Sequence, residues 1–338
     1  MENKLAIIDG SSLLYRAFYA LPPTMTSPDG VPTNAVYGFL RMLLSLYREL
    51  DPAYVAVTFD KDRQTFRTEM YDGYKATRKP APAELVPQFD LILEVMHVMG
   101  VAVYSLSGYE GDDVLGTLSA RYEKELPVAI VTGDRDALQL ASDRTTVYLT
   151  QKGISSMSEM TPKAVEEKYG ITPSQVIDMK ALMGDTADNI PGVPGIGEKT
   201  ALKLLTQYKT LDNLYAHVDE IKGAQGKKLA AGKDMAYLSY KLAAIKRDVP
   251  METTLEEMAQ PVHISEMKEL SSAASASISS PSSANFRASR LWPKRRRKKS
   301  QRQGRRQKTG RMACPLKERK PPFPSILKER LLSLKQKA

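Results

Sequence analysis

Short apolar runs rich in β-branched residues alternate with longer amphipathic segments along the first half of the chain. Residues 4–8 (KLAII), 54–59 (YVAVTF) and 127–132 (PVAIVT) have the length and composition of buried parallel strands. Segments 33–50 and 91–99 place apolar residues at helical spacing. Because strands that alternate with helices form mostly parallel sheets, residues 1–160 are predicted to be an α/β domain with helices covering a central sheet.

Strand patterns fade after residue 160, and short helical patterns follow one another. Each begins at a Thr-Pro pair or a Gly-containing turn, as in TPKAVEEKYG, TPSQVIDMKALMG, GIGEKTALKLL and KDMAYLSYKLAAI. Residues 161–270 are therefore predicted to form a smaller, all-helical domain.

At Ser271 the composition changes to a Ser/Ala run and then to a cationic stretch without lasting apolar periodicity, which predicts a disordered tail over 271–338. This tail carries 20 Lys and Arg against 2 Asp and Glu, whereas residues 1–270 carry 29 against 37. The net charge of +10 therefore comes from the tail, and the body is acidic. A body of this charge that handles nucleic acid must gather its acids around cations.

The remaining composition excludes several protein classes. No apolar run approaches the roughly 20 residues that cross a bilayer, and the start of the chain lacks the apolar stretch of a signal peptide, so a soluble, cytoplasmic protein with no membrane partner is expected. One cysteine, Cys314, permits neither an internal disulfide nor a thiolate metal cluster.

Each of the three predicted strands runs into an aspartate: Asp9 in IIDG, Asp60 in TFDKD and Asp134 in TGDRD. The carboxyl ends of parallel strands meet at the edge where such sheets bind ligands. A single Asp in this position is most simply a helix cap, but caps explain three together less well. We expect these side chains to share one edge of the sheet.

Further acids occur in similar patterns, in GYEGDDVLGTL, TGDRD and MGDTADNIPG: Glu110, Asp112, Asp113, Asp136, Asp185 and Asp188. Two like charges about 5 Å apart repel by roughly 3 kcal/mol at an effective dielectric near 20, so a rim of carboxylates must bind cations or take up protons. Oxygen-only ligands favour Mg²⁺, with Mn²⁺ as its substitute. The histidines His97, His217 and His263 lack acidic or cysteine partners at ligand spacing.

Two segments suit contacts with nucleic acid. The turn GVPGIG is followed by Lys199, Thr200 and Lys203 in the first turn of a helix pattern, the arrangement of a helix-hairpin-helix that receives a phosphate on backbone N–H groups. In TFRTEMYDGYKATRKPAP, basic residues alternate with Tyr71 and Tyr74, which suits a single strand as well as an ordinary solvated loop.

Six motifs, IIDGSSLLYRAF, TFD, FRTEMYDGYKATR, GYEGDDVLGTL, TGDRDALQL and GDTADNIPGVPGIGEKTALKLL, stand in the order and spacing of the 5′ nuclease domain of bacterial polymerase I, within the flap endonuclease family. The chain resembles that family to about Leu270. The resemblance implies a PIN-like α/β nuclease core, a helix-three-turn-helix domain and an arch that threads single strands. It also implies hydrolysis with two metal ions, leaving a 5′-phosphate and a 3′-hydroxyl.

The resemblance also assigns roles to individual residues. It implies a first metal cluster of Asp9, Asp60, Glu110, Asp112 and Asp113, and a second of Asp134, Asp136, Asp185 and Asp188. In the same way, the resemblance implies that the scissile phosphate and the flap are held by four basic residues, Arg16, Arg67, Lys75 and Arg78. It implies that the duplex is bound by the turn that contains Gly195, Gly197 and Lys199, and that this turn is a candidate site for a monovalent cation. Thr68 and Gly111 depart from the histidine and alanine that are common in relatives.

The expected function is a flap endonuclease and 5′-3′ exonuclease that acts as a monomer on 5′ flaps, nicks, gaps and RNA-primed ends in primer removal and repair. Polymerase activity is not expected. A non-catalytic helix-hairpin-helix DNA-binding protein and a PIN-type ribonuclease stay open as alternatives. Two interpretations of residues 271–338 also stay open, namely a DNA-anchoring tail and a polymerase linker translated out of frame.

Overall fold

The computed structural model describes residues 3–27, 30–151 and 156–259. The predicted tail over 271–338 lies outside these residues, as does the end of the predicted helical domain. Within the described part, no helix is long and apolar enough to cross a membrane.

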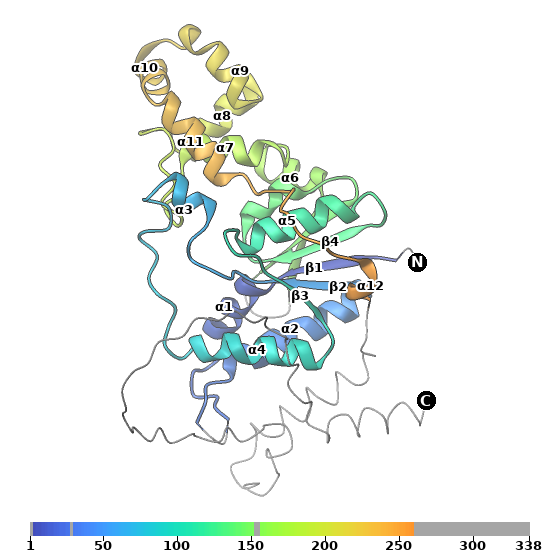
Figure 1. Ribbon diagram of the computed structural model, residues 1–338. Helices are drawn as coiled ribbons and strands as arrows, with labels where there is room; N and C mark the ends of the chain where they lie inside the picture. The colour runs from blue at the N-terminus through green and yellow to red at the C-terminus, as the bar shows by residue number, and fades with distance from the viewer. Residues whose placement is uncertain (1–2, 28–29, 152–155, 260–338) are drawn as a thin grey trace, which may run out of the picture. The chain divides into compact units, whose positions relative to one another are not determined.

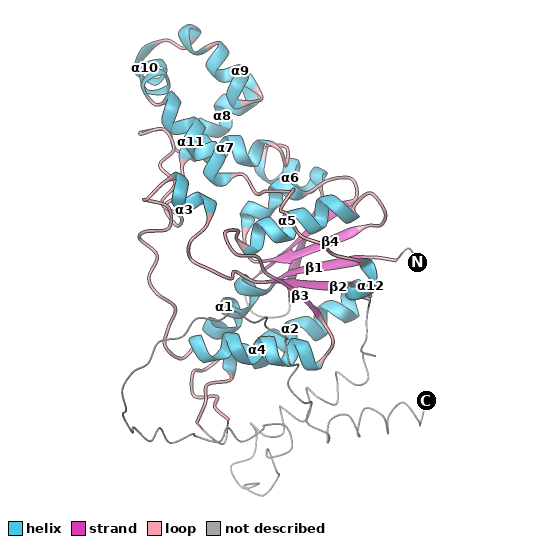
Figure 2. Ribbon diagram, viewed as in Figure 1, coloured by secondary structure: helices cyan, strands magenta, loops and turns pink. Residues whose placement is uncertain are grey.

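The described strands form one six-stranded sheet in the order β3-β2-β1-β4-β5-β6. Its strands are β1 Leu5–Asp9, β2 Tyr54–Thr58, β3 Ala102–Tyr104, β4 Val128–Thr132, β5 Thr145–Thr150 and β6 Met157–Met160. All neighbours are parallel except β5 and β6, which confirms the mostly parallel sheet (Figure 2). The three strands predicted from sequence are β2, β1 and β4, the central part of this sheet.

Helices cover both faces of the sheet. Alternate residues of the central strands, such as Ile8 and Val57, pack on α1 (Gly10–Ala20), α2 (Asn34–Leu50) and α4 (Val86–Val98). The residues between them, such as Ile7 and Ile130, pack on α5 (Gly111–Tyr122) on the opposite side (Figure 1). Each central strand is thus buried on both faces, which explains why its sequence is a continuous apolar run.

The remaining helices include the short α3 (Phe66–Met70) and the 3-10 segment η1 (Arg135–Leu140). The others are α6 Pro162–Tyr169, α7 Gln175–Met183, α8 Glu198–Tyr208, α9 Leu211–Ala216, the 3-10 segment η2 Val218–Glu220, α10 Gly223–Ala231, α11 Lys233–Ala243 and α12 Leu255–Met258. Leu204 and Leu214 of this helical part belong to the same buried core as Ile7 of the sheet. The boundary predicted at residue 160 therefore does not coincide with a break in the core.

After α11 the chain returns along α5 to the sheet. The Arg121 guanidinium donates to the Met251 carbonyl at 2.9 Å and to the Thr253 hydroxyl at 2.8 Å. Tyr104, at the end of β3, donates to the Glu257 carboxylate at 3.2 Å, and α12 contacts β2. This return fastens the end of the helical part to the face of the sheet that α5 covers.

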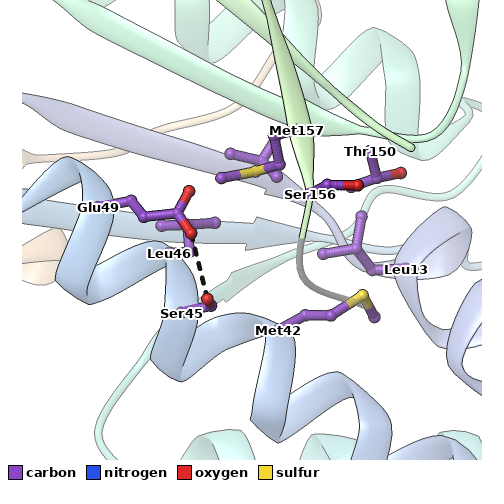
Figure 3. Close-up of a pocket in the computed structure, with 9 residues that line it drawn as sticks. Leu13, Met42, Ser45, Leu46, Glu49, Thr150, Ser156 and Met157 are labelled. Atoms are coloured by element: carbon purple, nitrogen blue, oxygen red, sulfur yellow. Dashed lines mark hydrogen bonds between the residues drawn. The ribbon is translucent and has the colours of Figure 1, made fainter. Parts of the chain in front are cut away.

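A small pocket lies between α1, α2 and the β5–β6 pair (Figure 3). Leu13, Met42, Leu46 and Met157 line it, and beside them the Ser45 hydroxyl donates to the Glu49 carboxylate at 3.2 Å. None of the acids that end the strands lines this pocket. This pocket is therefore separate from the metal site that the sequence predicts.

The hairpin between α7 and α8 requires glycine at Gly192. Its φ is 61°, and a Cβ placed there would lie 2.2 Å from the backbone nitrogen of Gly184. Its N–H donates to the Ser239 hydroxyl at 2.9 Å, which ties the hairpin to α11.

We expect Gly192→Ala to lower the free energy of unfolding by roughly 3 kcal/mol or more, because left-handed strain and a backbone clash add together. Gly170→Ala is the matched control, since Gly170 has a similar φ of 71° and a Cβ added there would meet nothing within 4 Å. It should cost only about 1 kcal/mol. Equal losses for the two variants in urea unfolding would contradict the packing of the hairpin.

Candidate active site

Asp9 and Asp134 stand at the carboxyl ends of the neighbouring strands β1 and β4. One Asp9 carboxylate oxygen accepts from the backbone N–H of Ser12 at 2.9 Å, and the other from the Thr132 hydroxyl at 2.6 Å. The same hydroxyl oxygen accepts from the Asp134 N–H at 3.0 Å. Thr132 therefore holds both acids at one edge, as the sequence predicts for Asp9 and Asp134.

Asp60 and Asp112 join this edge from β2 and α5. The Asp60 carboxylate accepts from the Gly111 N–H at 2.8 Å, which brings the first turn of α5 to the end of β2. Gly111 suits this contact, because a Cβ there would lie 3.2 Å from the backbone carbon of Phe59. Asp112 is the residue after Gly111, and the negative charges of Asp9, Asp134 and Asp60 repel its carboxylate.

Burial and mutual repulsion disturb the ionisation of these carboxyls. Burial, with smaller contributions from Asp60 and Asp134, raises the pKa of Asp9 to about 7 although two hydrogen bonds oppose it. Burial followed by repulsion from Asp9 raises the pKa of Asp112 well above its ordinary value. Lys75, Arg78 and Lys180 form their ion pairs with other acids, and none of the three pairs with Asp9, Asp60, Asp112 or Asp134.

Cations from the loop after α3 neutralise a second group of acids, Glu110 and Asp188. The Lys75 ammonium lies 2.8 Å from the Glu110 carboxylate and 3.9 Å from that of Asp188, which also pairs with Arg78. The Lys75 backbone has a φ of 54°, and its N–H donates to the Asp188 carbonyl at 2.8 Å. The loop is thus fixed to the 185–190 turn through its backbone as well as its charges.

Lys180 of α7 neutralises a third group, Asp136 and Asp185. Its ammonium lies 2.7 Å from the Asp136 carboxylate and also pairs with Asp185. Burial would raise the pKa of Asp185, but the Lys180 ammonium and the backbone N–H groups of Ala187 and Asp188 together lower it. Burial raises the pKa of Asp136 to about 6, with Asp134 adding to the effect and Lys180 opposing it.

One cleft gathers most of the predicted acids and cations. The predicted site residues that line it are Asp9, Asp60, Arg67, Tyr74, Lys75, Arg78, Glu110, Asp112, Asp134, Asp136 and Asp188. Asp185 reaches it through Lys180. Arg16 is half-buried. It lies beside Gly133, where an added Cβ would be 3.9 Å from its guanidinium.

Asp113 and Arg67 differ from the roles expected of them. Asp113 is fully buried and is not among the residues that line the cleft, and its two oxygens accept from the Arg67 guanidinium at 2.7 and 2.8 Å. They also accept from the N–H groups of Glu110 and Lys246 at 3.1 and 2.9 Å. Arg67, 2% exposed, further donates to the carbonyls of Leu242 and Ala244. All acceptor positions of Asp113 are used, which leaves none for a metal.

The two tyrosines expected to stack on bases pack instead against the helical part. Tyr74 is 5% exposed and lies in an apolar cluster with Ile190 and Leu242, against which Tyr71 also packs. The Tyr74 hydroxyl donates to the Glu110 carboxylate at 3.1 Å. Its ring therefore supports the loop from inside rather than offering a face to a base.

The predicted hairpin residues lie at the surface, as a backbone-binding turn requires. Gly195, Gly197, Lys199 and Lys203 are exposed and Thr200 is half-buried, whereas Ile196 between the two glycines is buried in the main core. Gly195 has a φ of 79°, and Gly197 precedes the first residue of α8. The structure thus holds the turn by one apolar side chain and leaves its backbone accessible.

Sequence reasoning missed Thr132, Ser11 and Lys180. The Ser11 hydroxyl accepts from the Asp60 N–H at 3.1 Å, so hydroxyls from two strand ends join the acids to one another. A hydroxyl residue next to each acid-bearing strand end, as in IIDGSS and VTGD, is the signal that could have found them. Lys180 gives no such signal, because a lysine in an amphipathic helix is ordinarily solvated.

The residues suit hard divalent cations by their chemistry. In the ranges described, no three potential ligand side chains already stand at the spacing of a metal centre. Lys75, Arg78 and Lys180 pair with Glu110, Asp188, Asp136 and Asp185. Asp9, Asp60, Asp112 and Asp134 nevertheless present only oxygen donors, and burial together with mutual repulsion raises the pKa values of Asp9 and Asp112.

Two family models match adjoining parts of the chain. The N-terminal resolvase-like domain of the 5′-3′ exonucleases matches residues 4–170, and their C-terminal SAM fold matches residues 171–266. The chain belongs to the 5′-3′ exonuclease family. The family resemblance inferred from the motifs is thereby confirmed, and with it the assignment to the hydrolytic nucleases.

Bacterial DNA polymerases I are similar in sequence. The chain is 51% identical to that of Bacillus caldotenax over 261 residues, which cover 77% of this chain and 30% of that protein. It is 46% identical to that of Bacillus subtilis over 256 residues, which cover 75% of this chain and 29% of that protein. The chain therefore spans less than a third of the length of these relatives.

Solved structures share the fold. A zinc-bound bacteriophage T5 5′-exonuclease has a TM-score of 0.58 at 21% identity, covering 80% of this chain and 100% of its own. A T5 flap endonuclease, solved as a pseudo-enzyme-product complex with DNA and metal ions, also has a TM-score of 0.58, at 19% identity, covering 82% and 100%. This confirms a sheet flanked by helices followed by a helical part.

Arg67→Met should lower the free energy of unfolding by about 3 to 5 kcal/mol, because it leaves the Asp113 carboxylate buried without its partner. The double variant Arg67→Met with Asp113→Asn removes that charge and should recover at least about 1 kcal/mol. Urea unfolding measures both. A double variant no more stable than the single one would show that the pair is not what holds α3 to α5.

The stability of the metal-free protein should depend on Asp9. Because its pKa in the fold, about 7, lies above the ordinary 3.8, the fold binds more protons, and its stability falls as pH rises between these values. Asp9→Asn, which keeps an N-cap acceptor, should therefore be more stable than the parent at pH 8, by about 1 to 3 kcal/mol, with the gap closing towards pH 4. Thermal unfolding in chelator measures this, with exposed Asp143→Asn as control; a pH-independent gap for Asp9→Asn would contradict it.

Proposed function

We propose that this chain is a divalent-metal-dependent 5′ nuclease that hydrolyses phosphodiester bonds in DNA at 5′ flaps, nicks and gaps, including RNA-primed ends during primer removal and repair. One observation carries the proposal, namely that seven carboxylates from separate segments line one cleft together with Lys75 and Arg78. Acids alone would repel a phosphate, whereas acids that hold metal next to fixed cations attract it.

Asp9, Asp60, Asp112 and Asp134 would hold one Mg²⁺, since none of them pairs with Lys75, Arg78 or Lys180. This set exchanges Glu110 for Asp134 in the first of the two clusters that the resemblance implies. Asp136, Asp185, Asp188 and Glu110 surround the place of a second, and Mn²⁺ would substitute for either. Bound there, the ions supply an activated water and stabilise the attacking and leaving oxygens. The T5 flap endonuclease solved with DNA and metal ions has the same fold, which supports this assignment.

The chain's own cations would position the DNA. Lys75 and Arg78 reach the cleft from one loop, and their partners Glu110 and Asp188 belong to the acid rim. A scissile phosphate that enters beside them replaces these carboxylates as the partner of the two cations. Arg67 and Asp113 would act only by holding α3, and therefore this loop, against α5.

The hairpin would bind the duplex part of the substrate. Exposed Gly195 and Gly197 allow the DNA backbone to approach closely, and Lys199 and Lys203 of α8 stand beside them. These groups contact phosphates rather than bases, so binding should be independent of sequence and weaken with salt. A monovalent cation at this turn would strengthen the same contact.

The purified chain with Mg²⁺ should cleave a 5′-flap DNA and release a product with a 3′-hydroxyl on the flap. Asp134→Ala should lower the single-turnover rate by at least about a hundredfold, because it removes both a metal ligand from the edge and the acceptor of the Asp136 N–H. The exposed Asp143→Asn is the matched control and should cleave like the parent.

The same assay separates the alternatives. Binding of flap DNA without cleavage at any metal concentration would favour a non-catalytic helix-hairpin-helix protein. Preferential cleavage of an RNA hairpin of the same shape would favour a PIN-type ribonuclease. Cleavage by Asp134→Ala at the parent's rate would contradict the proposed site itself.

A further inference from the structure

Lys180 lies where two acids from different segments meet. Its side chain is 15% exposed, and its ammonium lies 2.7 Å from an Asp136 oxygen and pairs with Asp185 as well. Asp136 comes from η1, after β4, whereas Lys180 and Asp185 come from α7 and the turn after it. The surface recess at this point is lined by Ser12, Gly133, Asp134, Arg135, Asp136 and Lys180.

The acid rim is therefore divided by charge. Asp9, Asp60, Asp112 and Asp134 form no ion pair with Lys75, Arg78 or Lys180, whereas Asp136 and Asp185 share the Lys180 ammonium. In the first group, Asp9 and Asp60 accept hydrogen bonds from neutral N–H and hydroxyl donors. In the second, an incoming cation meets a positive charge already bound to the same oxygens.

We propose that Lys180 is an exchangeable occupant of the Asp136–Asp185 pair, which a divalent cation must displace, so that the second ion binds more weakly than the first. This rests on the proposed metal-dependent function. A lysine suits the role because its ammonium is compact and its stem has four rotatable carbons, so it can leave the pair without moving α7. The recess beside it gives the displaced ammonium access to water.

A purely structural role is the competing explanation, because Lys180 also ties α7 to η1. The two explanations differ in what removal of the ammonium does. A tie predicts lower stability of the fold and metal binding that is unchanged or weaker. An exchangeable occupant predicts that the second ion binds more tightly once the ammonium is gone.

The experiment is calorimetric binding of Mn²⁺ to the full chain without DNA, for the parent, Lys180→Met, Lys180→Arg and Lys163→Met. The last is the matched control, since Lys163 is 85% exposed and pairs only with Glu167 in the described part of the chain. The parent should bind a first Mn²⁺ more tightly than a second. Lys180→Met should strengthen the second binding at least tenfold and leave the first unchanged, whereas Lys180→Arg and the control should resemble the parent.

A second measurement uses the unmodified sequence and so does not depend on a variant that folds. Acetylation of Lys180, followed by mass spectrometry, should be slow in chelator and several-fold faster at saturating Mn²⁺, with Lys163 unchanged. Second-ion affinity that Lys180→Met leaves unchanged, or acetylation that Mn²⁺ does not accelerate, would overturn this inference alone. Absence of any Mn²⁺ binding by the parent would overturn the proposed function and this inference together.

Discussion

The parallel pairing of β1 with both β2 and β4 is the constraint on which the rest of the site depends. It brings the ends of three strands to one edge, and each of those ends leads into an aspartate. Like charges at such spacing oppose folding unless something offsets them. Three features reduce this repulsion. The Thr132 hydroxyl donates to Asp9, the raised pKa of Asp9 favours its neutral form, and the Lys180 ammonium pairs with Asp136.

Basic residues in one short segment have different tasks. Arg67 is buried and holds Asp113, whereas Arg78, eleven positions on, is half exposed and pairs with Asp188 at the cleft. The segment between them carries Tyr74 into an apolar cluster with the helical part. The loop that reaches the cleft is therefore held in place by buried contacts. Its composition alone predicts an ordinary solvated loop in which all the basic residues are exposed.

Sequence reasoning succeeded where the signal is local. The three central strands and the acids at their ends follow from apolar runs and strand termini, and α2 was predicted to within a residue at its start. The short edge strand β3 and the antiparallel β6 carry no comparable pattern. The contacts of Arg67 and Tyr74 were not predicted, because their partners, Leu242 and Ala244 for Arg67 and Ile190 for Tyr74, lie more than a hundred positions away. No local pattern reveals such pairs.

One buried core joins the sheet to the helical part and fixes the distance between them. Ile196 of the hairpin and Val114 of α5 belong to one continuous core, so side-chain packing rather than a flexible linker connects the hairpin to the acid edge. The spacing between the hairpin and the acid edge is therefore fixed by the packing of buried apolar side chains, as two points are fixed on a rigid frame.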